Sequence, residues 1–199
     1  MKSSFKVVLC LVAAIVPVCL FGCSGGTAAS YNLNKDASFS TDWGALLQYK
    51  IDSSWEEHGA SSFVSYSGNN GFVGIDIQDT NSSLYQYSTD KSYADWQDRQ
   101  REHGLDSGSD DIEYSNYSLE EAGTTTIDGY DFRLYKEKYT ATYSDELLEK
   151  FKESDPNAQK TQENEMCHAV IKDGTHDMVI TASSESLLND FVKTMTIKW

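Results

Sequence analysis

The order of apolar and polar residues divides the chain into a short apolar start and a longer region of alternating character. Residues 7–20 are apolar, are interrupted once by Pro17, and follow two lysines, Lys2 and Lys6. A membrane-spanning helix needs roughly 20 apolar residues, so this run is too short to form one. A basic start followed by a short apolar run is typical of an export signal.

Strict alternation on both sides of Gly68-Asn69-Asn70-Gly71 predicts a β-hairpin over residues 62–67 and 72–78. Asn and Gly tolerate the positive φ that a tight hairpin turn requires. Pairing across this turn separates the side chains cleanly. One face receives Val64, Tyr66, Val73, Ile75 and Ile77, and the other receives Ser65, Ser67, Gly74 and Asp76. The first face is therefore expected to be buried.

Further strand patterns lie before and after this hairpin. Leu47, Tyr49 and Ile51 alternate with polar residues, and a turn over residues 52–55 follows. The later strands and turns are expected, in order, at 112–119, 124–127, the turn Asp128-Gly129, 130–139, 165–172, the turn Asp173-Gly174, 175–182 and 195–199. Asp-Gly pairs favour the two-residue turns of antiparallel hairpins.

Helical spacing of apolar residues occurs in three places. Helices are expected at 89–103, at 145–153 and from 184 onward, with an exposed loop over 154–164. In the first helix, Ser92 and Asp95 imitate a capping box, and Gly104 is expected to end it. The last helix presents one apolar stripe, made of Leu187, Leu188, Phe191 and Val192.

These elements predict a single α+β domain, with an antiparallel sheet of about six to nine strands and helices packed on one face. We place this domain at residues 45–199. Residues 24–42 are rich in Ser, Gly, Ala, Asn and Asp, a composition typical of flexible linkers. Residues 23–44 are therefore assigned to a flexible spacer.

Several local features, taken in order, match those of one known family. They are Tyr49-Lys50-Ile51 leading to Trp55, the turn Ile127-Asp128-Gly129-Tyr130 before a long strand, and a closing hairpin, helix and strand. Over residues 45–199 the chain resembles the PsbP-like fold of photosystem extrinsic proteins, a Ran-binding import factor and many small bacterial lipoproteins. The resemblance implies a binding or accessory role, often without catalysis, and transfers no functional residue. Ser53-Ser54 depart from it, since that family commonly has a proline before the tryptophan.

The apolar start ends in Leu20-Phe21-Gly22-Cys23. This sequence resembles the bacterial lipobox, although Phe21 replaces the small residue that is usual there. The resemblance implies that Leu20 and Gly22 direct processing, that residues 1–22 are removed as a lipoprotein signal peptide, and that the Cys23 thiol is lipidated. The protein would then lie outside the cytoplasm, anchored to the cell membrane by lipid. The alternative is an ordinary secretory signal that is cleaved near residues 28–30.

The charge of the chain limits its partners. The full chain has 16 basic and 31 acidic side chains, a net charge of −15. Removal of residues 1–22 takes away Lys2 and Lys6 and no acidic residue, so 14 basic side chains remain and the net charge becomes −17. Such a surface repels nucleic acid, so no nucleic-acid partner is expected.

The cysteines and histidines are not arranged for metal binding or catalysis. Once Cys10 and Cys19 leave with the signal and Cys23 is lipidated, Cys167 remains alone and is interpreted as a small core residue. In the last hairpin, the expected turn pairs Ile171 with His176 and His168 with Val179. His168 and His176 then project from opposite faces and cannot share a metal, and Cys167 points away from His168. No metal site and no cofactor are expected.

The acidic loop at residues 106–113 is a further possible cation site. It concentrates oxygen ligands, but Gly108 does not lie where a calcium-binding EF-hand loop would place its glycine. We interpret this segment as a solvated loop.

The twelve tyrosines suggest a binding surface. Aromatic rings beside carboxylates can bind a protein or a glycan. The candidate binding face consists of Tyr114, Tyr117, Tyr135 and Tyr139. The alternative is that half-buried tyrosines are simply favoured in strands.

The main hypothesis from sequence is thus a non-catalytic module of the cell envelope. It would be tethered to the membrane and would bind an envelope protein or a wall component. Two alternatives stay open. One is an envelope hydrolase that acts on glycan or peptide through carboxylates which the fold brings together. The other is a structural lipoprotein without a specific ligand.

Overall fold

The structure of the protein is a computed structural model, which describes residues 31–106 and 108–199. The predicted signal peptide, Cys23 and the first part of the predicted spacer lie outside these residues. Over the described ranges, no helix has the length and apolar character that crossing a membrane requires.

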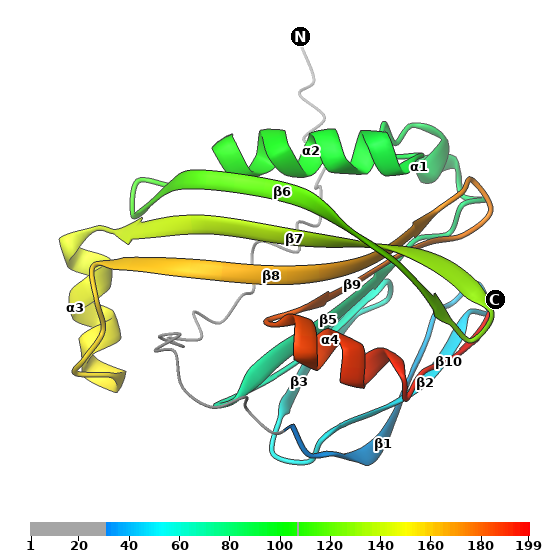
Figure 1. Ribbon diagram of the computed structural model, residues 1–199, viewed down its shortest axis with the longest axis horizontal. Helices are drawn as coiled ribbons and strands as arrows, with labels where there is room; N and C mark the ends of the chain where they lie inside the picture. Colours follow the sequence, from blue (N-terminus) through cyan, green and yellow to red (C-terminus); the bar gives the residue numbers. More distant parts are fainter. Residues whose placement is uncertain (1–30, 107) are drawn as a thin grey trace, which may run out of the picture.

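Two antiparallel sheets and four helices make up the described part of the chain (Figure 1). The larger sheet has the strand order β3-β4-β5-β9-β8-β7-β6 and the smaller has the order β1-β2-β10. The strands are β1 (Leu33–Ser40), β2 (Leu46–Asp52), β3 (Glu56–Ala60), β4 (Phe63–Gly68), β5 (Gly71–Ile77), β6 (Ile112–Ile127), β7 (Tyr130–Tyr143), β8 (Thr161–Lys172), β9 (Asp177–Ala182) and β10 (Thr196–Lys198). The helices are α1 (Ser83–Gln86), α2 (Tyr93–Asp106), α3 (Asp145–Ser154) and α4 (Glu185–Val192). The predicted α+β class and the size of the main sheet are confirmed.

Helices cover both faces of the larger sheet, so the prediction of helices on one face is wrong. Adjacent residues of a strand point to opposite faces of the sheet. In β8, one of two adjacent residues contacts the core on one side and the next contacts α2 on the other. Ala169 packs in the core that contains α4, whereas Val170 packs with Trp96 of α2. Figure 1 accordingly shows α2 above the long strands and α4 below them. Most residues on both faces of the central strands β8 and β9 are buried, and each face therefore needs a cover.

The core between the larger sheet, α4 and the smaller sheet contains the predicted apolar stripe of α4. Phe191 is completely buried, and its ring centroid lies 5.3 Å from that of Tyr49 in β2. Ser184 begins the helix as predicted, because its hydroxyl accepts a hydrogen bond from the amide of Leu187. Helix α4 thus joins the two sheets through one apolar cluster.

The predicted hairpin of β4 and β5 is confirmed, including its register. Gly68 pairs with Gly71 and Tyr66 pairs with Val73. A Cβ atom on Gly68 would lie 2.3 Å from the ring of Trp55, so glycine is required at this position for packing. The Trp55 indole nitrogen donates a hydrogen bond of 2.6 Å to Asn70 Oδ1, which fastens the turn.

The predicted spacer over residues 23–44 is too long. Residues Leu33–Ser40 form strand β1, which pairs with β2 along its length. Leu33, Ala37 and Phe39 pack against the core, while the residues between them are polar and exposed. This weak alternation was hidden by the Ser, Asn and Asp residues around it. The folded domain therefore begins before the predicted residue 45.

Helix α2 also differs from its prediction. It continues through Gly104 to Asp106, where the sequence predicted a stop. A Cβ atom on Gly104 would lie 2.1 Å from the ring of Tyr117 in β6. The glycine therefore allows close packing of helix on strand and does not end the helix. The hydroxyl of Ser92 accepts from the amide of Asp95, as the predicted cap requires.

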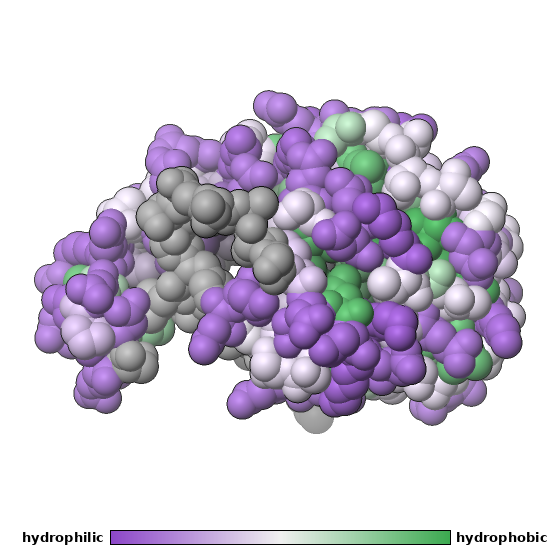
Figure 2. Space-filling model, turned by 60° about the horizontal axis from the view of Figure 1, so that its bottom comes forward, coloured by the Kyte–Doolittle hydropathy of each residue, from purple (hydrophilic) through white to green (hydrophobic). Residues whose placement is uncertain are grey.

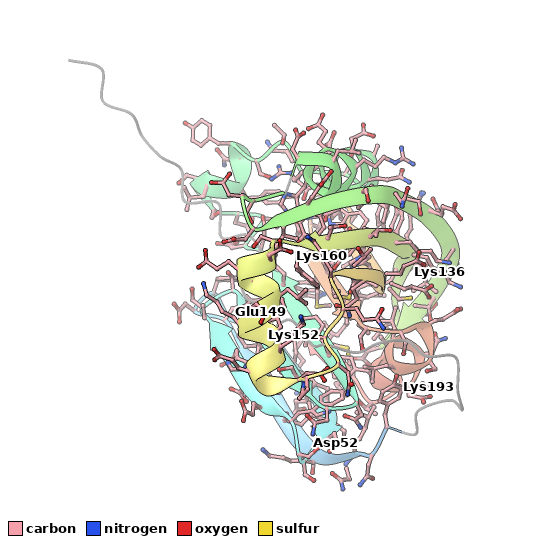
Figure 3. All side chains as sticks on the ribbon, turned by 90° about the vertical axis from the view of Figure 1, so that its left-hand side faces the viewer. Asp52, Lys136, Glu149, Lys152, Lys160 and Lys193 are labelled. Atoms are coloured by element: carbon pink, nitrogen blue, oxygen red, sulfur yellow. The ribbon has the colours of Figure 1, made fainter. Side chains whose placement is uncertain are left out.

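Helix α3 lies at the far end of the long strands β7 and β8 and faces the viewer in Figure 3. Its start is capped by Ser144, whose hydroxyl accepts from the amide of Leu147. Lys152 Nζ lies 2.8 Å from Glu149 Oε1, and Lys160 Nζ lies 2.6 Å from Asp145 Oδ1. These exposed pairs contribute little stability, because water screens them.

Polar residues cover most of the face seen in Figure 2, and apolar residues appear there only in scattered places. This agrees with the acidic composition of the chain. Four large apolar side chains are more than a third exposed in the described part of the chain: Trp43, Leu84, Tyr87 and Leu105.

Candidate functional site

The four tyrosines of the predicted binding face do lie on one face of the larger sheet, the face that α2 covers. We call it the α2 face. Tyr135 is only 1% exposed, because Trp96 of α2 lies on it with ring centroids 4.8 Å apart. Tyr117 packs against Gly104, and its hydroxyl is buried. These two rings are part of the packing between helix and sheet, and they do not form an exposed surface.

Tyr114 and Tyr139 lie farther along β6 and β7, toward α3. Their ring centroids are 5.4 Å apart in an edge-to-face arrangement, and both side chains are partly exposed. Burial and the nearby carboxylate of Glu137 raise the pKa of each phenol above its usual value. Both hydroxyls therefore stay protonated at physiological pH and can donate hydrogen bonds. This pair is a part of the predicted face that is accessible to solvent.

His168 is the centre of a buried polar network on the α2 face. His168 Nε2 lies 3.0 Å from Glu137 Oε2, and His168 Nδ1 lies 2.9 Å from Thr181 Oγ1. Burial alone would raise the pKa of Glu137, but the hydrogen bond and charge of His168 hold it below its usual value. The carboxylate is therefore ionised and orients the imidazole.

Thr181, His168 and Glu137 are connected in the order of a hydroxyl, a base and an orienting acid. This is the arrangement found in nucleophilic hydrolases. Thr181 is 9% exposed and His168 is 6% exposed, and Trp96 stacks edge-on against the imidazole at 5.6 Å. A substrate would have to displace α2 to reach the hydroxyl. The geometry instead fits a polar network that aligns β7, β8 and β9 under the helix.

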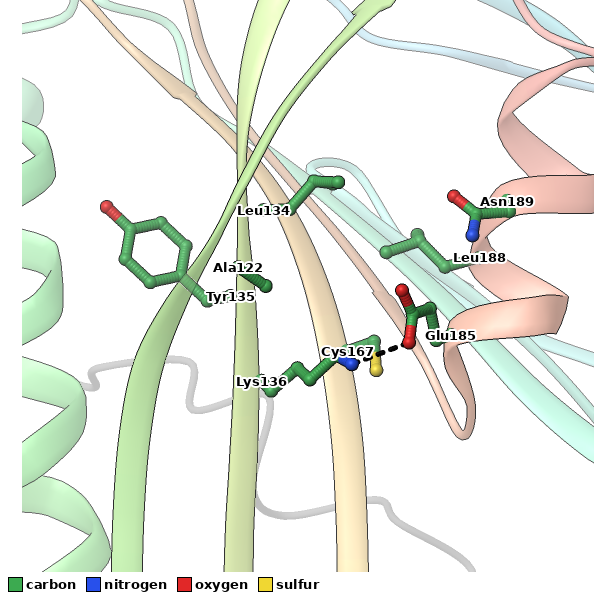
Figure 4. A pocket seen from close by; sticks show the side chains of 8 residues that line it. All are labelled: Ala122, Leu134, Tyr135, Lys136, Cys167, Glu185, Leu188 and Asn189. Carbon is green, nitrogen blue, oxygen red and sulfur yellow. Dashed lines mark ion pairs between the residues drawn. The ribbon is translucent and has the colours of Figure 1, made fainter.

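A small hollow lies on the opposite face, between β7 and α4 (Figure 4). Lys136 Nζ and Glu185 Oε2 form an ion pair of 2.6 Å beside it, and the Cys167 thiol lies at its wall. Its volume is about 10 Å³, roughly the space of one water molecule. Sites for small organic molecules are typically about 300–1,000 Å³. This hollow therefore cannot hold a substrate or cofactor of that size.

Cys167 is the core residue that the sequence predicted. It is 2% exposed, and burial followed by the nearby Glu165 and Glu185 raises the pKa of its thiol to about 11. A thiol with this pKa is a poor nucleophile at physiological pH.

The predicted register of β8 and β9 is wrong by two residues. Ile171 pairs with Met178, where a two-residue turn would have paired it with His176. Asp173 explains the difference. Its Oδ1 accepts hydrogen bonds from the amides of Thr175 at 2.8 Å and His176 at 2.7 Å, which closes a four-residue loop. A shift of two residues leaves every side chain on its predicted face.

The histidines of this hairpin point apart, as expected. His168 pairs with Thr181 rather than with the predicted Val179, and it faces α2. His176 packs on the other side, with its ring centroid 4.7 Å from that of Trp199. Within residues 31–106 and 108–199, no group of three or more His, Cys, Asp or Glu side chains is arranged to hold a metal ion.

Sequence reasoning missed a buried charged cluster at the end of the α2 face that lies beneath α1. Lys172, Asp177 and Asp90 have side-chain exposures of 1%, 2% and 9%. Lys172 Nζ forms ion pairs with Asp177 Oδ1 and, at 3.4 Å, with Asp90 Oδ2. Asp76 of β5 lies on the same face. The available signal was the predicted position of Asp76 on a sheet face whose other members, Ser65, Ser67 and Gly74, carry no charge.

Comparisons of the sequence with protein-family models and with curated proteins give no match. Among solved structures, the chain is similar to the solution structure of cyanobacterial PsbP (CyanoP) from Synechocystis sp. PCC 6803. The two share 12% sequence identity with a TM-score of 0.45, over 87% of this chain and 98% of the other. PsbP is also the family that the order of elements in the sequence resembled. At this identity and TM-score, the likeness says nothing about what the chain binds or does.

Proposed function

We propose that the protein is an extracytoplasmic module, anchored to the cell membrane through lipidated Cys23, that binds another component of the cell envelope. The single observation that carries this proposal is the sequence Leu20-Phe21-Gly22-Cys23 at the end of a short apolar run. The folded domain adds support, because its first strand begins at Leu33. Only nine residues separate Cys23 from that strand, so they span at most about 30 Å. The domain is then held close to the bilayer.

The binding surface in this proposal is the part of the α2 face around Tyr114 and Tyr139. Long strands extend beyond the end of α2 toward α3 (Figure 1), and these two rings lie on that extension. Partly exposed tyrosines contribute large contact areas with little loss of conformational entropy, which makes them frequent anchors in interfaces. The domain is strongly acidic. The partner that fits is therefore an envelope protein with a basic surface.

The test is capture of the partner by the purified, tagged domain from detergent-solubilised envelopes. We expect the Tyr114→Ala, Tyr139→Ala double variant to capture at least about tenfold less partner, since loss of an interface hot spot costs about 2 kcal/mol or more. The matched control is Tyr87→Ala. Tyr87 is 87% exposed, but it lies beyond α1 at the other end of the α2 face.

Melting curves of each variant show whether the domain remains folded. Equal capture by wild type and by the double variant would contradict the proposed surface. Loss of capture in Tyr87→Ala alone would move the surface to α1. Capture of wall material, with no protein partner, would replace the proposed partner class.

A further inference from the structure

The segment between β5 and α2 crosses one end of the sheet, and the amide of its first residue, Gln78, donates a hydrogen bond of 3.0 Å to the carbonyl of Asp177 in β9. It comprises residues 78–92 and contains α1. Tyr85 is buried beneath it, Thr80 Oγ1 donates a hydrogen bond of 2.9 Å to the carbonyl of Thr175, and Asp90 pairs with Lys172. Its other side is open: the side chains of Leu84 and Tyr87 are 82% and 87% exposed.

The cluster beneath this segment has more negative than positive charge. Asp76, Asp90 and Asp177 face one lysine, Lys172, so the group carries a net charge of −2 when all four are ionised. Among the residues that the structure describes, two buried carboxylate oxygens, Asp90 Oδ1 and Asp177 Oδ2, have no hydrogen-bond partner, and neither has the hydroxyl of Tyr85. Buried carboxylate oxygens without partners are costly when ionised. A bound proton both supplies a donor and removes a charge.

We infer that this cluster is a proton-binding site that clamps the segment over residues 78–92 onto the sheet and loosens it as protons are released. The geometry decides which part moves. Asp76 and Asp177 lie on the central strands β5 and β9, whereas Asp90 lies on the connecting segment. When the carboxylates repel one another, Asp90 is the member that can leave for water without breaking the sheet.

The direction of the pH dependence follows from the environment of the acids. Burial, and then the neighbouring charge of Asp177, raises the pKa of Asp76 to about 6. Burial raises the pKa of Asp177 to about 6 and that of Asp90 above its usual value, in spite of Lys172. A raised carboxyl pKa stabilises the native state where the acid is protonated, and this stabilisation is lost as pH rises through the raised value. The clamp is therefore tightest near pH 5 and loosens toward pH 8.

Other charged and titratable groups face the cluster, but they do not cancel its charge. The positive charge of Arg99 in α2 lowers the pKa of Asp90 and of Asp177, as Lys172 does. The negative charge of Asp95 in α2 raises the pKa of Asp90. Around the buried phenol of Tyr85, Asp173 adds further negative charge. The phenol of Tyr93 and the guanidinium of Arg133 stack on each other at 4.4 Å nearby. The cluster therefore keeps a net negative charge when its three aspartates are ionised.

Hydrogen exchange of the whole domain tests this inference. The amides of Gln86, Tyr87 and Ser88 are hydrogen-bonded within the segment. After correction for intrinsic exchange rates, we expect their protection to fall at least about tenfold between about pH 5 and about pH 8. In Asp76→Asn, which removes one of the repelling charges without changing the shape of the side chain, we expect most of this fall to disappear.

The matched control is Asp42→Asn, at an exposed aspartate in the turn between β1 and β2, which should behave as wild type. Carbon-detected titration of the carboxyl groups adds a second readout that needs no variant, and Asp76 and Asp177 should titrate near pH 6. Protection that is independent of pH in the wild type would overturn the inference. So would titration of both acids near their ordinary values, or an unchanged pH dependence in Asp76→Asn.

Discussion

Replacement of Phe191 by alanine is expected to lower the free energy of unfolding by about 3–5 kcal/mol. The ring is completely buried and lies in contact distance of Tyr49, so it connects α4 with the smaller sheet. Its removal forfeits the transfer free energy of the aromatic side chain and leaves a cavity at the junction of the two sheets. Urea unfolding, followed by tryptophan fluorescence, measures the change.

Leu84→Ala is the matched control for this prediction. Leu84 is also a large apolar side chain in a helix, but it is 82% exposed. Its truncation should change the free energy of unfolding by less than about 0.5 kcal/mol. If Phe191→Ala were no more destabilising than this control, the packing of α4 between the sheets would be wrong.

Replacement of Lys172 by methionine is expected to destabilise the protein by about 3–5 kcal/mol near pH 8. The methionine fills the space of the lysine stem but supplies no charge. Asp90 and Asp177 then remain buried without their counter-ion. The loss should be smaller near pH 5, because carboxyl groups whose pKa is already raised can take up protons there.

Lys138→Met is the matched control for Lys172→Met. Lys138 also pairs with a carboxylate across neighbouring strands, at 3.3 Å from Glu165, but its side chain is 60% exposed. The control should cost at most about 1 kcal/mol at either pH. Equal effects of the two substitutions, or a Lys172→Met effect that does not depend on pH, would contradict the buried ion cluster.

Local patterns predicted the hairpin of β4 and β5 well, because its two faces differ completely in polarity. Val64, Tyr66 and Val73 could lie on only one side, and the Gly68–Gly71 turn left a single register. The sequence predicts the apolar stripe of α4 for the same reason. In these elements, one face contacts the core and the other contacts water, so periodicity alone determines the structure.

Periodicity failed where packing between distant segments decides the outcome. The sequence predicts that Gly104 ends a helix, but the ring of Tyr117 in β6 requires a glycine there. The register of β8 and β9 depends on hydrogen bonds from the Asp173 side chain to its own loop, which alternation does not encode. The sequence predicts a linker at strand β1, because the exposed residues of this strand are those that linkers favour.

The candidate site was predictable only in part. Alternation placed Tyr114, Tyr117, Tyr135 and Tyr139 on strands, and the structure brings them to one face. Which of the rings are covered depends on where α2 lies, and the sequence did not give that position. The Lys172 cluster was missed for a related reason. Its members come from β5, β8, β9 and the segment before α2, so they meet only in the folded chain.

Mass spectrometry of the N-terminal peptide of the protein, isolated from whole native cells, decides whether the domain is anchored through Cys23. We expect a peptide that begins at Cys23 and carries acyl chains on the cysteine sulfur. A start beyond residue 23, an unmodified thiol at Cys23 or an intact segment over residues 1–22 would contradict it. In the first two cases the domain would be released from the membrane, and its proposed role close to the bilayer would fall with the anchor.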